Sequence, residues 1–414
     1  MTTLAALPVL DVDAPLGAPR SRQLCTDCGV SRTGWAHRCG SACQFIDPRY
    51  DALERQVHGR ARDGARGDEL HFGPYLRMLR ARLRVPAAGA QWSGITTRLG
   101  ELLLAHGLVD AVVATAAQPD DRWAPRPVLV TRAEDMAQCR GMKMGFSPVL
   151  AMLERAVRAG HRRVALIGVP CQVHALRALE REIGLERLFV IGTPCSDNTT
   201  PERFQEFLQL VSDAPAAVTY VEFMPDYKLE VRYRDGRVTR TPFIQLPLAS
   251  LPGDFFASTC RSCFDYTNAL ADLTVGYMGG SGEQWLLVRN ARGLELLGLL
   301  HEELVLSPVQ SRGRRRAAVA LFIRVLAQAR DGLPLRRAPR WARPLIGWMQ
   351  AHFGPRGLEF ARTRVEMKAA EGILTIQRER PRRAPRAIPD FAWRLVAPYG
   401  LVPPGTRPQP EQPA

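Results

Sequence analysis

The sequence predicts a mixed α/β (α+β) fold: a cysteine-rich N-terminal module, a central mainly parallel sheet with flanking helices, and a helical C-terminal extension. Four of the nine cysteines of the 414-residue chain lie near its start, between Cys25 and Cys43. Near-continuous apolar segments alternate with helical patterns through the middle, as in parallel sheets that are covered on both faces. After Ala291 the pattern is mainly helical. A chain of this length forms two or three domains.

The N-terminal segments differ in composition. Residues 1–22 are rich in Pro and Ala, which predicts a flexible N-terminus. The first cysteines lie within residues 23–47, and polar, Arg-rich residues follow to position 85. A helix is expected near residues 73–83. We treat residues 23–85 as one N-terminal module.

The alternation of helices and strands begins at residue 94. Residues 94–108 place leucines on one face of an amphipathic helix, and residues 109–114 and 127–130 predict strands. Residues 163–168 and 188–192 are strands that lead into the Pro-Cys pairs at Cys171 and Cys195. Both cysteines are therefore expected at the carboxyl edge of the sheet, where open α/β folds bind ligands.

Later segments change in style. Asp235 and Gly236 separate two strand patterns and predict a hairpin turn. Short strands are expected at residues 273–278 and 285–288. The expected division is a catalytic α/β domain over residues 86–290, a helical region over 291–385 and a Pro/Arg-rich tail over 386–414.

The charge is strongly positive, with a net charge of +15 and a pI near 10.0. Nucleic acid is one partner that such a charge suggests. The excess is mostly Arg without aromatic interleaving, and no nucleic-acid-binding motif is recognisable, so we predict no nucleic-acid partner. An acidic protein or an anionic membrane surface explains the charge equally well.

The chain carries no apparent targeting or membrane-spanning segment. Its N-terminus lacks the basic region of a secretory signal, which predicts a cytoplasmic protein. Trp341, Trp348 and Phe353 lie in a basic amphipathic stretch; we expect them to pack on the core, with contact to a membrane surface as the alternative. The oligomeric state stays open, with a homo-oligomer as one option, because no segment of the sequence marks an interface.

Eight cysteines form two candidate ligand sets. The compact set is Cys25, Cys28, Cys39 and Cys43, whose spacing suits one zinc ion as well as one iron–sulfur cluster. The dispersed set is Cys171, Cys195, Cys260 and Cys263, gathered from three distant segments, which is more typical of a buried redox cofactor than of structural zinc. Cys139 is left over and is expected not to be a ligand.

Glycine- and hydroxyl-rich segments suggest a second kind of site. Residues 91–97 open a helix, and free N–H groups at a helix N-terminus bind phosphate. Residues 276–282 offer a close backbone approach to a ligand. Each segment alone is more typical of an ordinary capped helix or turn.

Taken together, several segments resemble the beta-subunit family of deazaflavin-dependent hydrogenases and dehydrogenases. The similarity extends from Cys25 to about Lys368, and its signatures are residues 90–97, 168–172, 192–195, 260–265 and 271–276. Residues 43–46, 90–94, 140–143 and 147–148 are most similar to the tetrapyrrole-reducing branch of that family.

The resemblance implies FAD, two 4Fe-4S clusters and reduced ferredoxin as electron donor. It makes the cysteine-rich module an iron–sulfur module and both cysteine sets cluster ligands. Ser31 stands where the family usually has cysteine, and Cys39 is the replacement ligand. The implied flavin contacts are Gln91, Trp92, Ser93, Gly94, Thr96, Thr97, Lys143 and Asn268. Candidate proton donors, by motif proximity alone, are His174, Asp272 and Tyr277.

The expected activity is ferredoxin-dependent reduction of the 8-vinyl group of 3,8-divinyl (proto)chlorophyllide to ethyl. This would occur in the cytoplasm, with association with the photosynthetic membrane surface as an option. Three alternatives stay open: removal of the 7-hydroxymethyl oxygen of a chlorophyll, a ferredoxin- or deazaflavin-linked oxidoreductase of another kind, and a zinc-containing basic nucleic-acid-binding protein.

Overall fold

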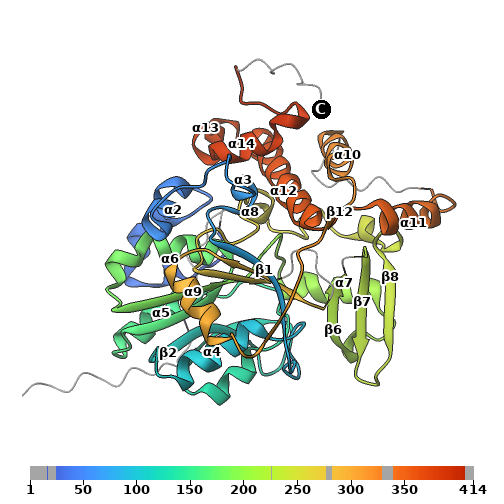
Figure 1. Ribbon diagram of the computed structural model, residues 1–414. Helices are drawn as coiled ribbons and strands as arrows, with labels where there is room; N and C mark the ends of the chain where they lie inside the picture. The colour runs from blue at the N-terminus through green and yellow to red at the C-terminus, as the bar shows by residue number, and fades with distance from the viewer. Residues whose placement is uncertain (1–15, 17–24, 225, 277–281, 329–338, 406–414) are drawn as a thin grey trace, which may run out of the picture.

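A large mixed sheet organises the molecule. The computed structural model describes residues 16, 25–224, 226–276, 282–328 and 339–405, so the expected flexible N-terminus lies almost wholly outside the described residues. The sheet has eight strands in the order β11-β1-β10-β9-β5-β4-β2-β3 (Figure 1). Its four central strands run parallel: β2 (Ala111–Ala117), β4 (Arg163–Gly168), β5 (Arg187–Gly192) and β9 (Leu273–Gly276). The predicted parallel centre is confirmed.

Antiparallel strands extend this centre on both sides. The flanking strands are β3 (Pro125–Val130) at one edge and β10 (Gln284–Val288), β1 (Arg77–Leu83) and β11 (Leu304–Ser307) at the other. The helix expected near residues 73–83 is wrong, because β1 occupies most of that segment. Leu79, Ala81 and Leu83 alternate with polar residues, a period of two that suits a strand between two neighbours.

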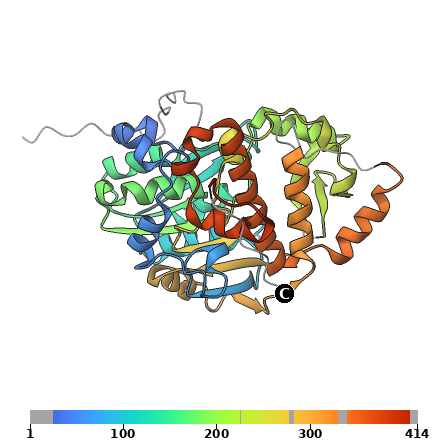
Figure 2. The same cartoon turned by 90° about the horizontal axis from the view of Figure 1, so that it is seen from above.

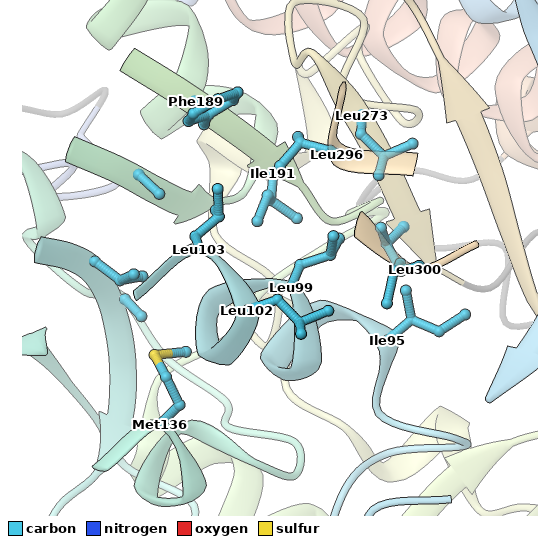
Figure 3. Packing of buried hydrophobic residues seen from close by; sticks show 14 of the residues in the cluster. Ile95, Leu99, Leu102, Leu103, Met136, Phe189, Ile191, Leu273, Leu296 and Leu300 are labelled. Carbon is cyan, nitrogen blue, oxygen red and sulfur yellow. The ribbon is translucent and has the colours of Figure 1, made fainter. Parts of the chain in front are cut away.

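Each face of the sheet is covered by helices. Along β5, Phe189 and Ile191 face one side, against α4 (Ile95–Ala105) and α9 (Ala291–Leu299) (Figure 3). Leu188 and Val190 face the other side, against α5 (Val149–Arg158) and α6 (Pro170–Ile183). This alternation follows from the two-residue period of a strand and explains why both faces are apolar.

The N-terminal module lies on the face covered by α5 and α6. Val30 and Ala42 join the apolar cluster of those helices, so this module packs directly on the sheet domain. Its elements are η1 (Val30–Arg32), η2 (Gly34–Arg38), α1 (Cys39–Ala42), α2 (Tyr50–His58) and α3 (Glu69–Phe72).

The C-terminal helices cover the other half of the sheet. Trp285 and Leu287 of β10 pack against α10 (Arg315–Gln328), α12 (Leu358–Glu379) and α14 (Asp390–Val396), which lie together over β1 (Figures 1 and 2). The tail expected from residue 386 therefore contains a packed helix. The small elements here are β12 (Ser311–Arg312), β13 (Arg356–Gly357) and α13 (Ala384–Ala387).

A separate three-stranded antiparallel sheet stands beside the main one. It contains β6 (Val218–Phe223), β7 (Lys228–Tyr233) and β8 (Val238–Pro242), backed by α7 (Pro201–Val211). The hairpin expected around Asp235 and Gly236 is confirmed, with Gly236 at a φ of 86° that glycine adopts readily.

One helix leaves its apolar face uncovered. α11 (Arg343–Phe353) contains no buried residue, and Trp341, Trp348 and Phe353 are 82%, 52% and 52% exposed. The expectation that these aromatic residues pack on the core is therefore wrong. Within the described part of the chain, no helix combines the length and the apolar character that a membrane span requires.

Candidate functional site

The compact cysteine set surrounds a single cavity. Cys25, Cys28, Cys39 and Cys43 all line it, and so does Ser31. Two 3-10 turns and the short α1 fold the intervening residues back, which brings the two close pairs together. Ser31 and Cys39 therefore line the same cavity, and the replacement of one by the other as a ligand stays a prediction.

Local geometry explains this convergence. Gly29 adopts a φ of 107°, and the carbonyl of Cys28 accepts a hydrogen bond from the backbone N–H of Leu150 at 3.0 Å. A Cβ on Gly29 would lie 2.6 Å from the backbone nitrogen of Ala151. Only glycine therefore lets this loop lie so close to α5.

The dispersed cysteine set gathers at the carboxyl edge of the parallel strands, as predicted. Cys171 is in the first turn of α6, directly after β4, and Cys195 follows β5. Cys260 belongs to α8 (Ser258–Arg261), and Cys263 follows that helix. The backbone N–H of Cys195 donates to the carbonyl of Tyr266 at 3.0 Å, which ties the two loops together.

The two cysteine sets adjoin. Cys171 also lines the cavity of the compact set, and the Thr26 side chain hydrogen-bonds to its thiol. The Gln44 amide donates to Sγ of Cys263 at 3.4 Å. Phe45 packs against cysteines of both sets. Two redox centres at these positions would be neighbours in contact through a few side chains.

Burial favours the protonated form of several of these thiols in the absence of a ligand. Burial first, and neighbouring cysteines second, raise the pKa of Cys43 to about 11 and that of Cys171 to about 12. Burial also raises the pKa of Cys28 and Cys195 well above the ordinary value. A bound metal centre would have to displace these protons, because thiolates are the ligands.

A buried cation from α12 stands beside the dispersed set. Lys368 is 4% exposed; its Nζ donates to Asp197 at 2.6 Å and to Glu371 at 2.9 Å. Burial alone would lower the pKa of Lys368, yet the two carboxylates hold it above its ordinary value. The charge of Lys368 also lowers the otherwise raised pKa of Cys260 and Cys263.

The described residues contain no group of three or more Cys, His, Asp or Glu side chains that could hold a single metal ion. Cys139 belongs to neither set. It packs against the apolar cluster on the α4 face of the sheet, and burial raises its pKa to about 11.

The first segment predicted to contact flavin forms the start of α4. The Gln284 side chain accepts from Ser93 Oγ at 2.9 Å and from the backbone N–H of Ile95 at 3.2 Å, and Thr97 Oγ1 donates to the Gly94 carbonyl at 3.1 Å. Gln284 begins β10, next to the end of β9. The start of α4 therefore lies at the carboxyl edge of the parallel strands. Gln91 and Thr96 are half-buried in the same segment.

Lys143 lies in a loop next to this segment. Its Nζ donates to the carbonyls of Cys139 and Arg140 at 2.6 and 2.8 Å, and burial lowers its pKa to about 8. Arg140 in turn donates to the carbonyl of Ala88 at 3.2 Å. The segments around residues 91 and 143 are thus brought together, as the resemblance implies. The hydrogen bonds of Lys143, however, go to carbonyls of its own loop.

Asn268 occupies the gap between two parallel strands. It is fully buried, has a φ of 58°, and donates to the carbonyls of Gly168 and Thr193 at 2.8 and 3.3 Å. Its Oδ1 and the buried Oε1 of Gln91 have no hydrogen-bond partner in the described residues. Unpaired buried acceptors are costly, so both atoms fit a bound group that donates hydrogen bonds.

The three candidate proton donors fare differently. His174 is fully buried beside Tyr50, its Nδ1 lies 3.1 Å from the Ala42 carbonyl, and burial lowers its pKa to about 4. This histidine is neutral near pH 7 and is a poor acid. Tyr277 lies outside the described residues.

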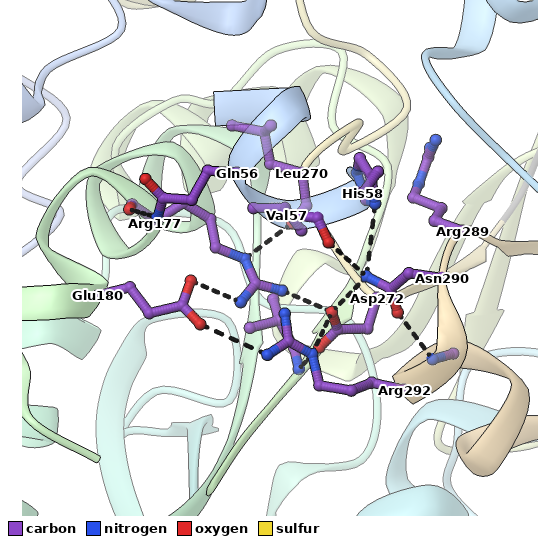
Figure 4. Close-up of polar contacts among 12 residues, drawn as sticks. Gln56, Val57, His58, Arg177, Glu180, Leu270, Asp272, Arg289, Asn290 and Arg292 are labelled. Atoms are coloured by element: carbon purple, nitrogen blue, oxygen red, sulfur yellow. Dashed lines mark hydrogen bonds and ion pairs between the residues drawn. The ribbon is translucent and has the colours of Figure 1, made fainter. Parts of the chain in front are cut away.

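Asp272 is a structural ion-pair partner. Its carboxylate accepts from Arg177 at 2.7 Å, from Arg292 at 3.0 Å, from Asn290 at 2.8 Å and from the backbone of Val190 at 2.7 Å (Figure 4). Burial acts to raise its pKa, but the neighbouring arginines hold it below the ordinary value. A carboxylate that four donors surround and that the arginines hold in its ionised form does not fit the proton-donor role, so this candidate is wrong.

Sequence reasoning missed an acid that lies close to Trp92. Glu222, on β6, is 7% exposed and accepts hydrogen bonds from the Trp92 indole and the Tyr220 hydroxyl. No sequence motif marks Glu222. An acidic residue directly after the apolar Val221, within a strand pattern, was the one available signal.

Two family models match the chain, both describing the coenzyme F420 hydrogenase/dehydrogenase beta subunit. The model of its N-terminal part matches residues 78–154, and the model of its C-terminal part matches residues 161–311. An uncharacterized protein of Nostoc sp. (strain PCC 7120) is 40% identical over 92% of this chain and 94% of its own length. The chain belongs to the coenzyme F420 hydrogenase/dehydrogenase beta-subunit family.

Other relatives refine this membership. The 7-hydroxymethyl chlorophyll a reductase of Oryza sativa subsp. japonica is 38% identical over 93% of this chain and 84% of its own length. A chain of the F420-reducing [NiFe] hydrogenase complex of Methanosarcina barkeri shares the fold, with a TM-score of 0.54, 21% identity, and coverage of 72% of this chain and 91% of that one. The predicted family and its tetrapyrrole-reducing branch are confirmed, and the named relatives are oxidoreductases.

Proposed function

We propose that this protein reduces the 8-vinyl group of 3,8-divinyl (proto)chlorophyllide to ethyl, with electrons from reduced ferredoxin. The similarity to a chlorophyll-modifying reductase over nearly the whole chain carries the proposal. Reduction of a vinyl group takes up two electrons and two protons. When bound, two 4Fe-4S clusters supply single-electron transfer and FAD supplies storage of two electrons and a hydride.

The chain's own residues supply the setting for that chemistry. Cys25, Cys28, Cys39 and Cys43 hold one cluster in this proposal, and Cys171, Cys195, Cys260 and Cys263 hold the other. The contact between the two sets, through Thr26, Gln44 and Phe45, supports a short electron route. In this proposal the flavin would be held at the carboxyl edge of the sheet, where the unpaired oxygens of Gln91 and Asn268 would accept hydrogen bonds from it.

Ferredoxin docks, in this proposal, beside the compact cysteine set. Arg38 and Arg49 lie beside α1, are 34% and 42% exposed, and form ion pairs with Glu182 and Asp47; in this proposal an acidic donor competes with those carboxylates for them. Arg49→Glu should raise the KM for ferredoxin and weaken its salt dependence. Arg132→Glu is the matched control, because Arg132 is 68% exposed and follows the edge strand β3, outside the cysteine module. Equal effects of both substitutions would refute this docking site.

Removal of a 7-hydroxymethyl oxygen is the second candidate activity, because the rice relative carries that name. Both reactions consume two electrons and differ in the substituent that is reduced. Anaerobic turnover with divinyl chlorophyllide and with hydroxymethyl chlorophyll, supplied separately, distinguishes them. Reduction of the hydroxymethyl pigment alone would replace the vinyl assignment.

We also propose that α11 contacts a membrane surface on which the pigment resides. Its exposed apolar stripe consists of Leu345, Trp348, Met349 and Phe353, and the exposed Trp341 precedes the helix. Amphipathic helices with tryptophan and neighbouring arginine bind anionic lipid interfaces. Co-sedimentation with anionic vesicles should fall for Trp348→Ser, and equal sedimentation of both proteins would refute the contact.

Composition is the first test of the proposal. Anaerobically purified protein should be brown, with flavin absorption and iron sufficient for two 4Fe-4S clusters. A colourless protein that contains zinc, without iron or flavin, would refute the redox function and favour the basic nucleic-acid-binding alternative.

A further inference from the structure

A cleft of about 220 Å³ opens between the Trp92 segment and the small sheet. Its walls include Arg82, Trp92, Ser93, Tyr220, Glu222 and Arg232. Trp92 and Ser93 belong to the segment that the family resemblance assigns to the flavin, so the cleft adjoins the proposed redox centre. It is too small for a tetrapyrrole, but it suits a substituent at the edge of one.

Glu222 lies in this cleft without a direct ion pair to the arginines of its walls. Its two carboxylate oxygens are hydrogen-bonded to the Trp92 indole and to the Tyr220 hydroxyl. Among the described residues it forms no ion pair. Glu230, its direct cross-strand neighbour, instead lies 2.7 Å from both Arg232 and Arg240.

The contrast separates the two carboxyl groups. Arg240 and Arg232 hold the pKa of Glu230 below its ordinary value against its burial, whereas burial raises the pKa of Glu222. Two acids whose surroundings separate their pKa values in this way are typical of acid–base sites. Glu230 therefore stays ionised, and Glu222 retains a proton more easily.

Backbone strain fixes the contact. Trp92 has a φ of 50°, a left-handed conformation that is unfavourable for a bulky residue. Such strain persists where the surrounding structure holds it in place, and it is concentrated at functional sites. Here the strained residue aims its indole N–H at Glu222.

We infer that Glu222, in the wall of the cleft, is the general acid of the reductase reaction. The inference rests on the proposed function. In vinyl reduction, the bound cofactor would supply a hydride for one C–H bond, and Glu222 would give its proton to the other vinyl carbon. In the hydroxymethyl reaction the same proton would leave with the oxygen as water. Solvent returns a proton to the carboxylate in either case.

The first experiment compares Glu222→Gln with the wild-type holoenzyme. The substitution should lower kcat about 10²–10⁴-fold. Iron content, flavin content and the rate of flavin reduction by ferredoxin should not change. Glu206→Gln is the control, because Glu206 pairs with Arg203 on α7 outside the cleft and should retain wild-type kcat. A wild-type kcat in Glu222→Gln would overturn the inference.

The second experiment needs no pigment, so it is independent of the proposed function. Infrared difference spectra recorded as a function of pH should show a protonated carboxyl band that titrates above the ordinary glutamate range and is lost in Glu222→Gln. The charged or titratable groups around Glu222 are Tyr220, Glu230, Arg232 and Arg82. The same titrating band in both proteins would overturn the inference, whereas a wild-type enzyme that reduces no tetrapyrrole would refute the proposed function alone.

Discussion

Replacement of Asp272 tests whether this residue stabilises the fold. Asp272 and its partner Arg177 are both fully buried, and four hydrogen bonds end on the one carboxylate. Asp272→Asn conserves volume, so no cavity forms. Loss of one partner of a buried ion pair costs about 3–5 kcal/mol. We expect the lower part of this range, because Glu180 stays 3.0 Å from Arg177.

Urea unfolding of the wild-type and variant holoenzymes measures this loss. The folded pKa of Asp272 is lowered, so its stabilisation is complete above the unfolded pKa near 3.9 and is lost as pH falls through the folded value. The gap between the two proteins should therefore be constant near neutral pH and narrow below about pH 4. Asp213→Asn is the control: its ion pair with Arg237 is largely exposed to solvent, so its loss should change the stability little. Unchanged stability of Asp272→Asn would refute this account.

Three further predictions concern single residues. Burial lowers the pKa of His58 to about 3, so on acidification the unfolded chain binds a proton at a higher pH than the folded protein does. The free energy of unfolding should therefore fall by up to about 4 kcal/mol between pH 6.5 and 3. His58→Gln should flatten this dependence of the unfolding free energy on pH, measured in acid unfolding curves. Lys368→Met should shift the midpoint potential of the neighbouring cluster to more negative values, while Lys368→Arg should keep it. A redox titration followed by electron paramagnetic resonance measures this potential. Equal potentials in Lys368→Met and the wild type would contradict the electrostatic role. Gly29→Ala should lower the iron content by disturbing the compact cysteine set, while Gly59→Ala, where a Cβ meets open space, should keep it; full iron content in both would contradict the packing argument.

Local patterns predicted the centre of the fold well. The apolar segments of β4 and β5 are buried on both faces, so their sequence carries the signal directly. β1 was missed because its alternating leucine and arginine residues also suit a helix over a short window. Its strand state depends on pairing with β10 and β11, which lie more than 200 positions later in the chain.

The candidate site divides in the same way. Both cysteine sets follow from spacing and strand ends, and the structure brings the members of the compact set to one cavity. Glu222 and Lys368 could not be predicted, because each becomes notable only through distant partners, Trp92 and Asp197. Asp272 was misassigned because a conspicuous motif position does not distinguish a structural ion pair from an acid.

Single turnover under anaerobic conditions tests the central claim most directly. The holoenzyme is mixed with reduced ferredoxin and 3,8-divinyl chlorophyllide, and ferredoxin oxidation is recorded together with the pigment spectrum. The account predicts a pigment with an 8-ethyl group and two electrons withdrawn from ferredoxin for each product molecule. Ferredoxin that reduces the protein while the vinyl pigment stays unchanged would contradict it.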